Sequence, residues 1–373
     1  MSTAAAYDTK KESRKGGGAK RKKSPAARFF RTLGRILLLL LETVALICLG
    51  LYCVMYVLAK GPSPTAKKLF VTSVRETSAI GFLANIYFSD EEIAEIEAVK
   101  QTEEYAPTDT SLISISTEKK PDSGGGPQAD AWGLVDEDGD GIIIEPVKGA
   151  GYSGYMMVVL DPSRVIMGSI PSSYNKRGYT VEEFVKYYDG VAGVNAGGFY
   201  DPDGMGDGSI PDSVVVFDGE IYYSEFGCSG GIAAIDGNHI LHVANRMTRQ
   251  ELIDNDIRYA VCYGPVLINN GVPADPDTLP HSLNPRTAIG QRSDGAMLLL
   301  VIDGRQVVSM GASFQDLVDI MQRYGAVNAM NLDGGSSSML WFEDHYVNNS
   351  SSVIGIRPIP TSFVVLKEGE ENG

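Results

Sequence analysis

An unbroken apolar segment near the N-terminus constrains this 373-residue chain more than any other feature. The segment covers residues 36–59, ILLLLLETVALICLGLYCVMYVLA, and Glu42 is its only charged side chain. A helix of that length extends to roughly 36 Å, which is enough to cross a lipid bilayer. The run is longer than the apolar core of a cleaved signal peptide. It therefore predicts a transmembrane signal anchor that binds the chain to the bilayer, with cleavage near Ala59 as the alternative.

The charge distribution predicts the orientation of this anchor. Residues 1–35 hold eleven Lys and Arg against two acidic residues, a net of +9, whereas the whole chain carries −15. Because positive flanks stay in the cytoplasm, we expect a single-pass plasma-membrane protein with a basic cytoplasmic tail and residues 60–373 outside. Those outer residues and the anchor together carry −24 (−15 minus 9). An acidic body argues against nucleic acid as a partner, since phosphate backbones need a basic face.

Composition divides the exported part into three regions. Residues 60–100 are apolar with a helical period and contain a helix start at Ser89–Glu92, so they predict a juxtamembrane helical stalk. Residues 101–130 are polar and end in PDSGGGPQAD, which is typical of a linker. Residues 131–368 have the composition of a globular domain.

The pattern of the globular domain predicts its fold class. Short apolar runs alternate with turn signals, which is typical of many short strands. Val216–Ile221 predicts a hairpin with an Asp-Gly turn, and Asp236–Gly237 resembles a second one. We therefore expect an α+β domain with a mixed, largely antiparallel β-sheet core and a few flanking helices. The expected helices are Thr180–Tyr188, Thr248–Asp254 and Ser313–Tyr324.

Two segments with acidic side chains stand at the ends of expected strands. Residues 331–338, NLDGGSSS, place a carboxylate beside two glycines and three hydroxyls. Asp333 can serve there as nucleophile, base or metal ligand, and the glycines leave space beside it. An Asx-turn with only a structural role is the alternative. Residues 303–305, DGR, read by themselves as a hairpin turn.

Two further polar segments suggest ligand contacts. Residues 195–200, NAGGFY, follow an apolar strand, and paired glycines there let backbone amides approach a ligand. Residues 284–290, NPRTAIG, place Arg286 where a loop enters a strand, which is a natural clamp for phosphate or carboxylate. A simple turn and a structural salt bridge are the respective alternatives.

Together these segments resemble the phosphodiester glycosidase family. NAGGF, GP, PRTAIG, DGR and NLDGGSSS occur in the family's order within residues 140–366. The membrane anchor and acidic stalk resemble bacterial, membrane-anchored members more than the animal enzymes of the uncovering type. Many members also carry an Arg at the position of Arg357, although Ile356 replaces the acidic residue that commonly precedes it.

The resemblance implies a set of site residues. It implies a catalytic role for Asp333, Arg286 and Asp303. It also implies a substrate-binding set, which consists of Asn195, Gly197, Gly198, Phe199, Asn331, Gly334, Gly335, Ser336 and Arg357.

The reaction implied is hydrolysis of the glycosidic C–O bond of a sugar-1-phosphodiester in a cell-surface glycan or related polymer. A phosphodiester is a good leaving group, so such a site needs a cation for the phosphate and a carboxylate near the anomeric carbon. Arg286, with Arg357, suits the first role and Asp333 the second. Two alternatives stay open: a non-catalytic glycan-binding or scaffold module facing the cell wall, and a metal-dependent phosphodiesterase that breaks the P–O bond.

No cofactor is firmly expected, and calcium is the cation to consider. Asp201, Asp203 and Asp207 form an acidic loop after NAGGFY and are the candidate ligands. Residues 136–141, DEDGDG, match the first six positions of an EF-hand loop, but Val147 stands where the bidentate Glu is needed.

The four cysteines do not form a disulfide scaffold. Cys48 and Cys53 lie in the predicted anchor, and only Cys228 and Cys262 lie outside it. This pair could be a disulfide or two buried thiols.

Overall fold

The computed structural model describes residues 25–77, 80–97, 104–115, 129–202, 205–223, 230–352 and 355–369. By its contacts the chain forms two compact units, Met1–Val57 and Leu58–Gly373.

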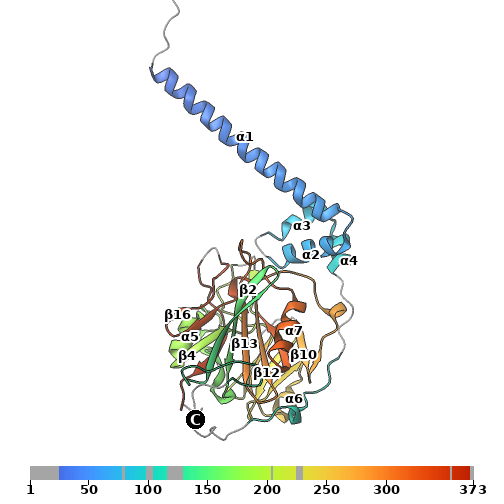
Figure 1. Cartoon of the computed structure of the whole chain (residues 1–373), viewed down its shortest axis with the longest axis vertical. Helices are drawn as coiled ribbons and strands as arrows, with labels where there is room; N and C mark the ends of the chain where they lie inside the picture. Colours follow the sequence, from blue (N-terminus) through green and yellow to red (C-terminus); the bar gives the residue numbers. More distant parts are fainter. Residues whose placement is uncertain are drawn as a thin grey trace, which may run out of the picture. The chain divides into compact units, whose positions relative to one another are not determined.

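A single long helix, α1 (Pro25–Lys60), contains the predicted anchor (Figure 1). The helix begins eleven residues before the predicted span, and its segment Phe29–Lys60 is long and apolar enough to cross a membrane. Large apolar side chains such as Leu41 and Leu46 are more than half exposed. Exposure of that much apolar surface to water is unfavourable, so α1 has the properties of a membrane anchor or a signal sequence.

Three short helices follow α1: α2 (Pro64–Arg75), α3 (Phe82–Tyr87) and α4 (Asp90–Glu97). The predicted helix start at Ser89 is confirmed, because the Ser89 hydroxyl accepts the Glu92 N–H and the Glu92 carboxylate accepts the Ser89 N–H. Both α3 and α4 pack against α2.

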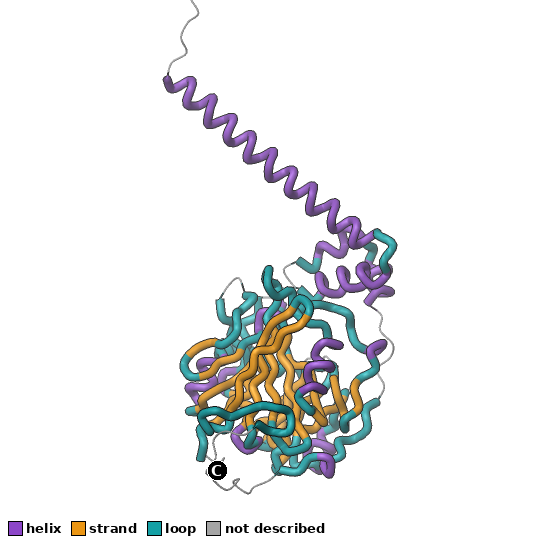
Figure 2. Tube along the Cα trace, in the orientation of Figure 1, coloured by secondary structure: helices purple, strands orange, loops and turns teal. Residues whose placement is uncertain are grey.

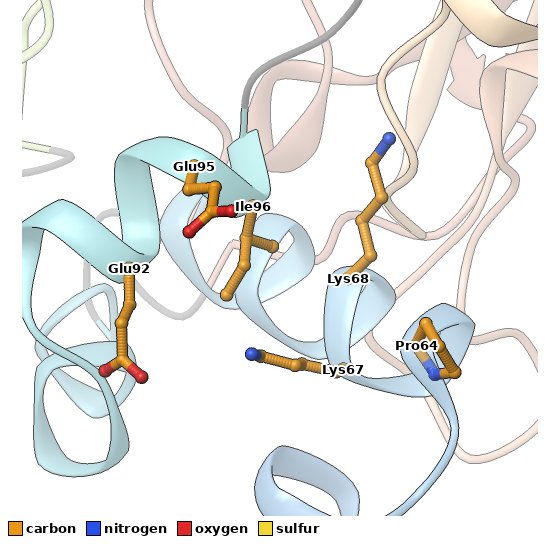
Figure 3. Close-up of a pocket in the computed structure, with 6 residues that line it drawn as sticks. All are labelled: Pro64, Lys67, Lys68, Glu92, Glu95 and Ile96. Atoms are coloured by element: carbon orange, nitrogen blue, oxygen red, sulfur yellow. The ribbon is translucent and has the colours of Figure 1, made fainter.

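A shallow hollow lies between α2 and α4 (Figure 3). It contains none of the residues predicted for the site. Its lining residues are Pro64, Lys67, Lys68, Glu92, Glu95 and Ile96.

Part of the segment predicted as a linker lies against the domain. Asn270 accepts the Asp109 N–H at 2.8 Å, and its side-chain amide donates to the Pro107 carbonyl at 2.9 Å. Ile113 is buried, and the Ser114 N–H donates to the Ser293 carbonyl. Residues 104–115 are therefore fixed to the domain surface, while the Gly-rich stretch at 124–126 lies outside the described residues.

The described strands form three sheets, and every pairing among them is antiparallel. The seven-stranded sheet has the order β1 (Ile142–Gly149), β2 (Tyr152–Val159), β13 (Met297–Ile302), β12 (Arg286–Arg292), β14 (Ala326–Leu332), β10 (Val266–Asn269), β11 (Val272–Pro273). The second sheet has the order β16 (His345–Tyr346), β15 (Leu340–Phe342), β4 (Gly190–Asn195), β17 (Thr361–Leu366), β3 (Val165–Ser169). The third has the order β6 (Glu220–Tyr223), β5 (Val214–Phe217), β9 (Ile257–Cys262), β7 (Ile232–Asp236), β8 (Leu241–Ala244).

Three helices accompany these sheets: α5 (Val181–Tyr187), α6 (Arg249–Asp254) and α7 (Phe314–Arg323). Each follows the Thr or Ser expected to start it, and in each the cap and the third helical residue form a reciprocal capping box. Single-turn 3₁₀ helices lie at Thr110–Leu112, Pro162–Arg164, Pro171–Ser173, Pro276–Thr278 and Gly335–Ser337. Strands dominate the domain in Figure 2, which confirms the α+β prediction.

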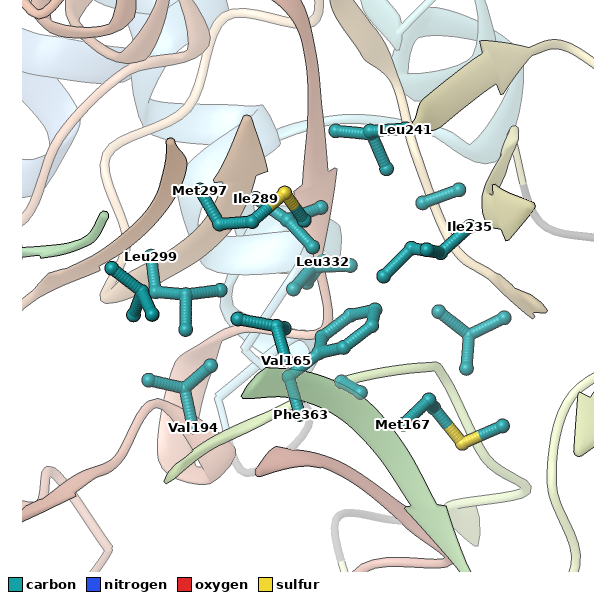
Figure 4. Packing of buried hydrophobic residues seen from close by; sticks show 14 of the residues in the cluster. Val165, Met167, Val194, Ile235, Leu241, Ile289, Met297, Leu299, Leu332 and Phe363 are labelled. Atoms are coloured by element: carbon teal, nitrogen blue, oxygen red, sulfur yellow. The ribbon is translucent and has the colours of Figure 1, made fainter. Parts of the chain in front are cut away.

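One apolar core lies between the three sheets (Figure 4). Each sheet contributes fully buried side chains to it, for example Leu299, Phe363 and Leu241. A second cluster packs α7 against the seven-stranded sheet. Burying each such side chain contributes on the order of 1.5–3 kcal/mol, so the sheets form a rigid support for the loops at their ends.

The two predicted hairpins also form. In the β5–β6 hairpin, Asp218 and Gly219 have φ of 50° and 76°, as the two central residues of a tight Asp-Gly turn require. The β7–β8 hairpin has a longer connection, in which the Asp236 N–H donates to the Ile240 carbonyl.

Candidate active site

Three of the predicted segments meet at the ends of strands β4, β12 and β14. Thr287 of β12 pairs with Leu332 of β14, so Arg286 and Asp333 lie at the same edge of the sheet. The Asn195 side chain, from the end of β4, donates to the Asp333 carbonyl at 2.5 Å, and the Asp333 N–H donates to the Ala196 carbonyl. Asn195 is fully buried. It therefore holds the Asp333 loop, whereas the resemblance implied that it binds substrate.

The Asp333 carboxyl is the most perturbed acid of this region. Its Oδ1 accepts the Gly334 N–H at 2.9 Å, and its Oδ2 is buried, with no close hydrogen-bond geometry to any of the described residues. Burial raises the pKa of Asp333 to about 6, against the lowering effects of the Ser337 hydroxyl, the Gly334 N–H and the Arg357 charge. A carboxyl that titrates near neutral pH and has one oxygen unused is suited to nucleophilic or base catalysis.

Tyr263 lies near both Asp333 and Arg286. Burial is the first cause of the raised pKa of Tyr263, the Asp333 carboxylate raises it further, and Arg286 lowers it. The phenol is therefore a neutral hydroxyl at physiological pH, able to donate to a carboxylate or to a substrate oxygen. Gly198 makes room for this ring, because a Cβ at that position would lie 2.8 Å from the Tyr263 Cδ2 atom.

A buried ion pair occupies one side of Asp333. Arg357 donates to both oxygens of Asp201, at 2.8 and 2.7 Å, and to the Ser336 hydroxyl at 3.2 Å. Burial lowers the pKa of Arg357, but the Asp201 and Asp333 carboxylates raise it more. The Arg357 guanidinium also lies 5.1 Å from the centroid of the Phe199 ring. Arg357, Asp201, Ser336 and Phe199 thus form one polar group beside Asp333.

A second basic group surrounds Arg286. The Arg286 guanidinium is stacked at 3.9 Å over the Phe314 ring, and its Nη2 donates to the Ser282 hydroxyl at 2.6 Å. Its side chain is only 4% exposed. Arg305 donates to the Asn284 side chain at 3.0 Å. Burial and the nearby Arg286 charge lower the pKa of Arg305, which shows that two guanidinium groups share this space.

The carboxylate within this basic group comes from outside the predicted domain. Glu76, the residue that ends α2, accepts from Ser282 at 2.6 Å, from Asn284 at 2.7 Å and from Arg286 at 3.2 Å. The Leu283 N–H also donates to the Ser73 hydroxyl of α2 at 2.9 Å.

The glycines of the site allow close backbone approach. A Cβ at Gly197 would lie 2.9 Å from the Val261 Cβ, and a Cβ at Gly334 would lie 2.8 Å from the Pro285 carbonyl oxygen. Gly335 has φ of 61°, a conformation that favours glycine, and its N–H donates to the same carbonyl. These residues shape the loop that holds Asp333.

Two residues predicted for the site, Asp303 and Asn331, are buried and hydrogen-bonded to other parts of the chain. Asp303 is buried, and its Oδ1 accepts from the Asn348 side chain and the Asn349 backbone N–H. It joins two loops, and no described contact connects it with Asp333. Asn331 is also fully buried and donates to the Gly264 carbonyl at 2.7 Å.

The structure gives two observations on the candidate cation ligands. Of the 201–207 loop, Asp201 pairs with Arg357, Asp207 is exposed and accepts the Ser209 N–H, and Asp203 lies outside the described residues. Within the described residues, the ligand atoms that lie within 4.8 Å of one another belong to Asp136, Asp138 and Asp140.

The EF-hand comparison fails at its twelfth position. Val147 is buried inside strand β1 and pairs with Gly154, so it belongs to a sheet and not to a calcium loop. Cys262 is buried in β9, and Cys228 lies outside the described residues, so the proposed pairing stays a prediction.

Sequence reasoning missed three residues of this region: Tyr263, Arg305 and Glu76. Tyr263 precedes the Gly-Pro step that the family comparison used, and Arg305 closes the DGR segment, so both had a local signal. Glu76 had none, because it lies in an ordinary amphipathic helix 210 residues from Arg286.

Part of the chain is similar in sequence to a known protein. A prophage-derived uncharacterized protein of Bacillus subtilis, YomE, is 31% identical over 182 residues, which are 47% of this chain and 28% of that protein. The chain thus spans about 28% of the length of that relative.

Two solved structures are similar to parts of this chain, and the first of them, at a TM-score of 0.50, is similar in fold. The first is the catalytic domain of zebrafish N-acetylglucosamine-1-phosphodiester alpha-N-acetylglucosaminidase, auto-inhibited by its pro-peptide, with a TM-score of 0.50 and 17% identity over 72% of this chain and 97% of that one. A hypothetical protein from Synechocystis has a TM-score of 0.43 and 14% identity, over 60% of this chain and 61% of that one.

The strongest of the comparisons is a family model. It is described as phosphodiester glycosidase, and it covers the strands and loops that carry Asn195, Tyr263, Arg286, Asp333 and Arg357. Residues 188–366 of this chain are similar to the phosphodiester glycosidase family.

Proposed function

We propose that the chain is a membrane-anchored, extracytoplasmic hydrolase that cleaves the glycosidic C–O bond of a sugar-1-phosphodiester. The observation that carries this proposal is the Asp333 carboxyl, with its pKa raised by burial to about 6, with Arg357 beside it and with Arg286 at the same edge of the sheet. The similarity of residues 188–366 to a family of glycosidases supports the same reaction class.

In the proposed reaction, charge develops at the anomeric carbon and on the departing phosphate, and side chains of the site stabilise both. Asp333 acts at the anomeric carbon, either as nucleophile or as the group that stabilises an oxocarbenium-like transition state. Arg286 and Arg305 bind the phosphate, which carries the electron pair of the broken C–O bond away as a phosphomonoester. Water supplies the hydroxyl that ends on the sugar, and its proton passes to the departing phosphate.

The sequence and α1 support the proposed membrane location. The basic residues before the helix favour a cytoplasmic N-terminus, and the helix is long enough to cross the bilayer. The substrate proposed is therefore a glycan or polymer at the outer cell surface. Any cation held by the acidic loops is proposed to be calcium, without a place in the reaction.

Hydrolysis in ¹⁸O-labelled water tests the proposal against its alternatives. The full chain in detergent micelles is incubated with a panel of sugar-1-phosphodiesters, and the products are analysed by mass spectrometry. Label on the sugar supports C–O cleavage, whereas label on the phosphate would show a phosphodiesterase that breaks P–O. Binding of the panel without turnover would favour the non-catalytic module.

A further inference from the structure

The contacts of Glu76 resemble those of a bound ligand. Ser282 and Asn284 are 0% and 2% exposed, and the Arg286 side chain is 4% exposed, so the three donors form a buried cradle. The Glu76 side chain that occupies it is 35% exposed and comes from the end of a separate helix. Buried donors are costly when unpaired, so this cradle is built to hold an anion.

The charge and the shape of the occupant match a phosphodiester. Glu76 Oε1 accepts from the Ser282 hydroxyl, and Oε2 accepts from the Asn284 amide and from Arg286. A phosphodiester also carries one negative charge and presents two non-bridging oxygens. Replacing the Glu76 carboxylate with a phosphodiester therefore leaves the net charge beside Arg286 and Arg305 unchanged. A phosphodiester can therefore replace the carboxylate one for one.

We infer that Glu76 is an internal competitor, which occupies the phosphate subsite of the proposed reaction and must leave before substrate binds. The inference rests on the proposed function for the identity of the ligand. Undocking would also release the Ser73 hydroxyl from the Leu283 N–H, so α2 leaves with Glu76. Glu76 stands only sixteen residues after Lys60, the last residue of α1, so the competitor belongs to the segment that joins the site to the anchor.

The competition predicts a gain of affinity when the carboxylate is removed. If the open state is a minor one, the apparent Kd of an anion is weakened by the fraction of open molecules. Glu76→Ala should therefore lower the Kd for dimethyl phosphate, the probe, by at least about tenfold in the full chain in micelles. Glu76→Gln, which keeps the side-chain shape, should lower it in the same direction.

A matched control comes from the same group of helices. Glu95→Gln removes one negative charge from α4, outside the cradle, and should leave the Kd unchanged. Adding Arg286→Ala to Glu76→Ala should abolish the gain, because the principal cation of the cradle is then absent. Unchanged affinity in both folded Glu76 variants would overturn the inference.

Hydrogen exchange tests the native chain without substitution. Saturating dimethyl phosphate should increase exchange of the α2 backbone amides at least about tenfold, since the ligand shifts the equilibrium to the undocked helix. Amides of α2 that stay protected at saturation would refute the competition. These binding measurements do not depend on turnover, so the two proposals can fail separately. Tighter binding of dimethyl phosphate by the Glu76 variants, without hydrolysis of any substrate, would reject the proposed function. Hydrolysis by a chain whose phosphate binding does not change in the Glu76 variants would reject the role of Glu76.

Discussion

The Asp333 carboxyl connects the stability of the domain with its proposed activity. Burial raises the pKa of Asp333 from 3.8 to about 6. Because the folded chain holds this proton more tightly than the unfolded chain, the stabilisation is fully present below pH 3.8 and is lost as the pH rises through about 6. A shift of about two units corresponds to about 3 kcal/mol in the free energy of unfolding.

Asp333→Asn removes this titration while keeping the size of the side chain. We expect the stability of the variant, relative to the native chain, to increase by about 2 kcal/mol between pH 4 and pH 7, which is most of the full effect. Urea unfolding in micelles, followed by the fluorescence of Trp132 and Trp341, measures it. Asp207→Asn, at an exposed aspartate, is the control and should show no such pH dependence.

The same substitution tests catalysis. If Asp333 acts as nucleophile or base, its carboxyl must be ionised, so native turnover should rise as the pH increases through about 6. Asp333→Asn should reduce turnover at least about a hundredfold, or about 2.7 kcal/mol in activation free energy. A stability difference that does not change with pH would refute the buried carboxyl. A folded variant with near-native turnover would show that another group performs the reaction.

Four further results are expected. Arg286→Ala should raise KM for phosphodiesters about tenfold or more with a smaller effect on kcat, measured by steady-state kinetics, because it removes charge complementarity and not the reacting group. Asp201→Asn should move the acidic limb of the pH–rate profile to lower pH, because the Asp201 charge raises the pKa of Asp333 and the freed Arg357 lowers it. Exhaustive chelation should leave activity within about twofold, and a loss that calcium alone restores would make the aspartates ligands. Protease added outside intact cells should release a fragment from beyond residue 60, and complete protection would reverse the expected orientation.

Several elements could be predicted from the sequence because neighbouring residues determine them. Ser313 starts α7 through a capping box with Asp316, three residues away, and Asp218–Gly219 forms its hairpin turn with no help from distant parts of the chain. The apolar length of 36–59 likewise predicts a helix of spanning length by itself.

The motifs also identified the segments that form the site, but not the role of each side chain. Asn195 has the right residue type for a sugar contact, yet it is buried and holds the Asp333 carbonyl, 138 residues away. Asp303 was predicted to be catalytic from its resemblance to the family, whereas its carboxylate joins the loop at Asn348. The residue types thus predicted where the site lies, whereas the packing determined the role of each side chain.

The sequence by itself determined the long apolar helix, the caps, the hairpins and the polar segments at the strand ends. Only the tertiary structure decided that the Asp333 carboxyl is buried and that Glu76 lies against Arg286. The physical reason is the distance along the sequence between the groups that interact. Caps and turns depend on backbone groups a few residues apart, whereas desolvation and ion pairing depend on what the fold brings together over 210 residues.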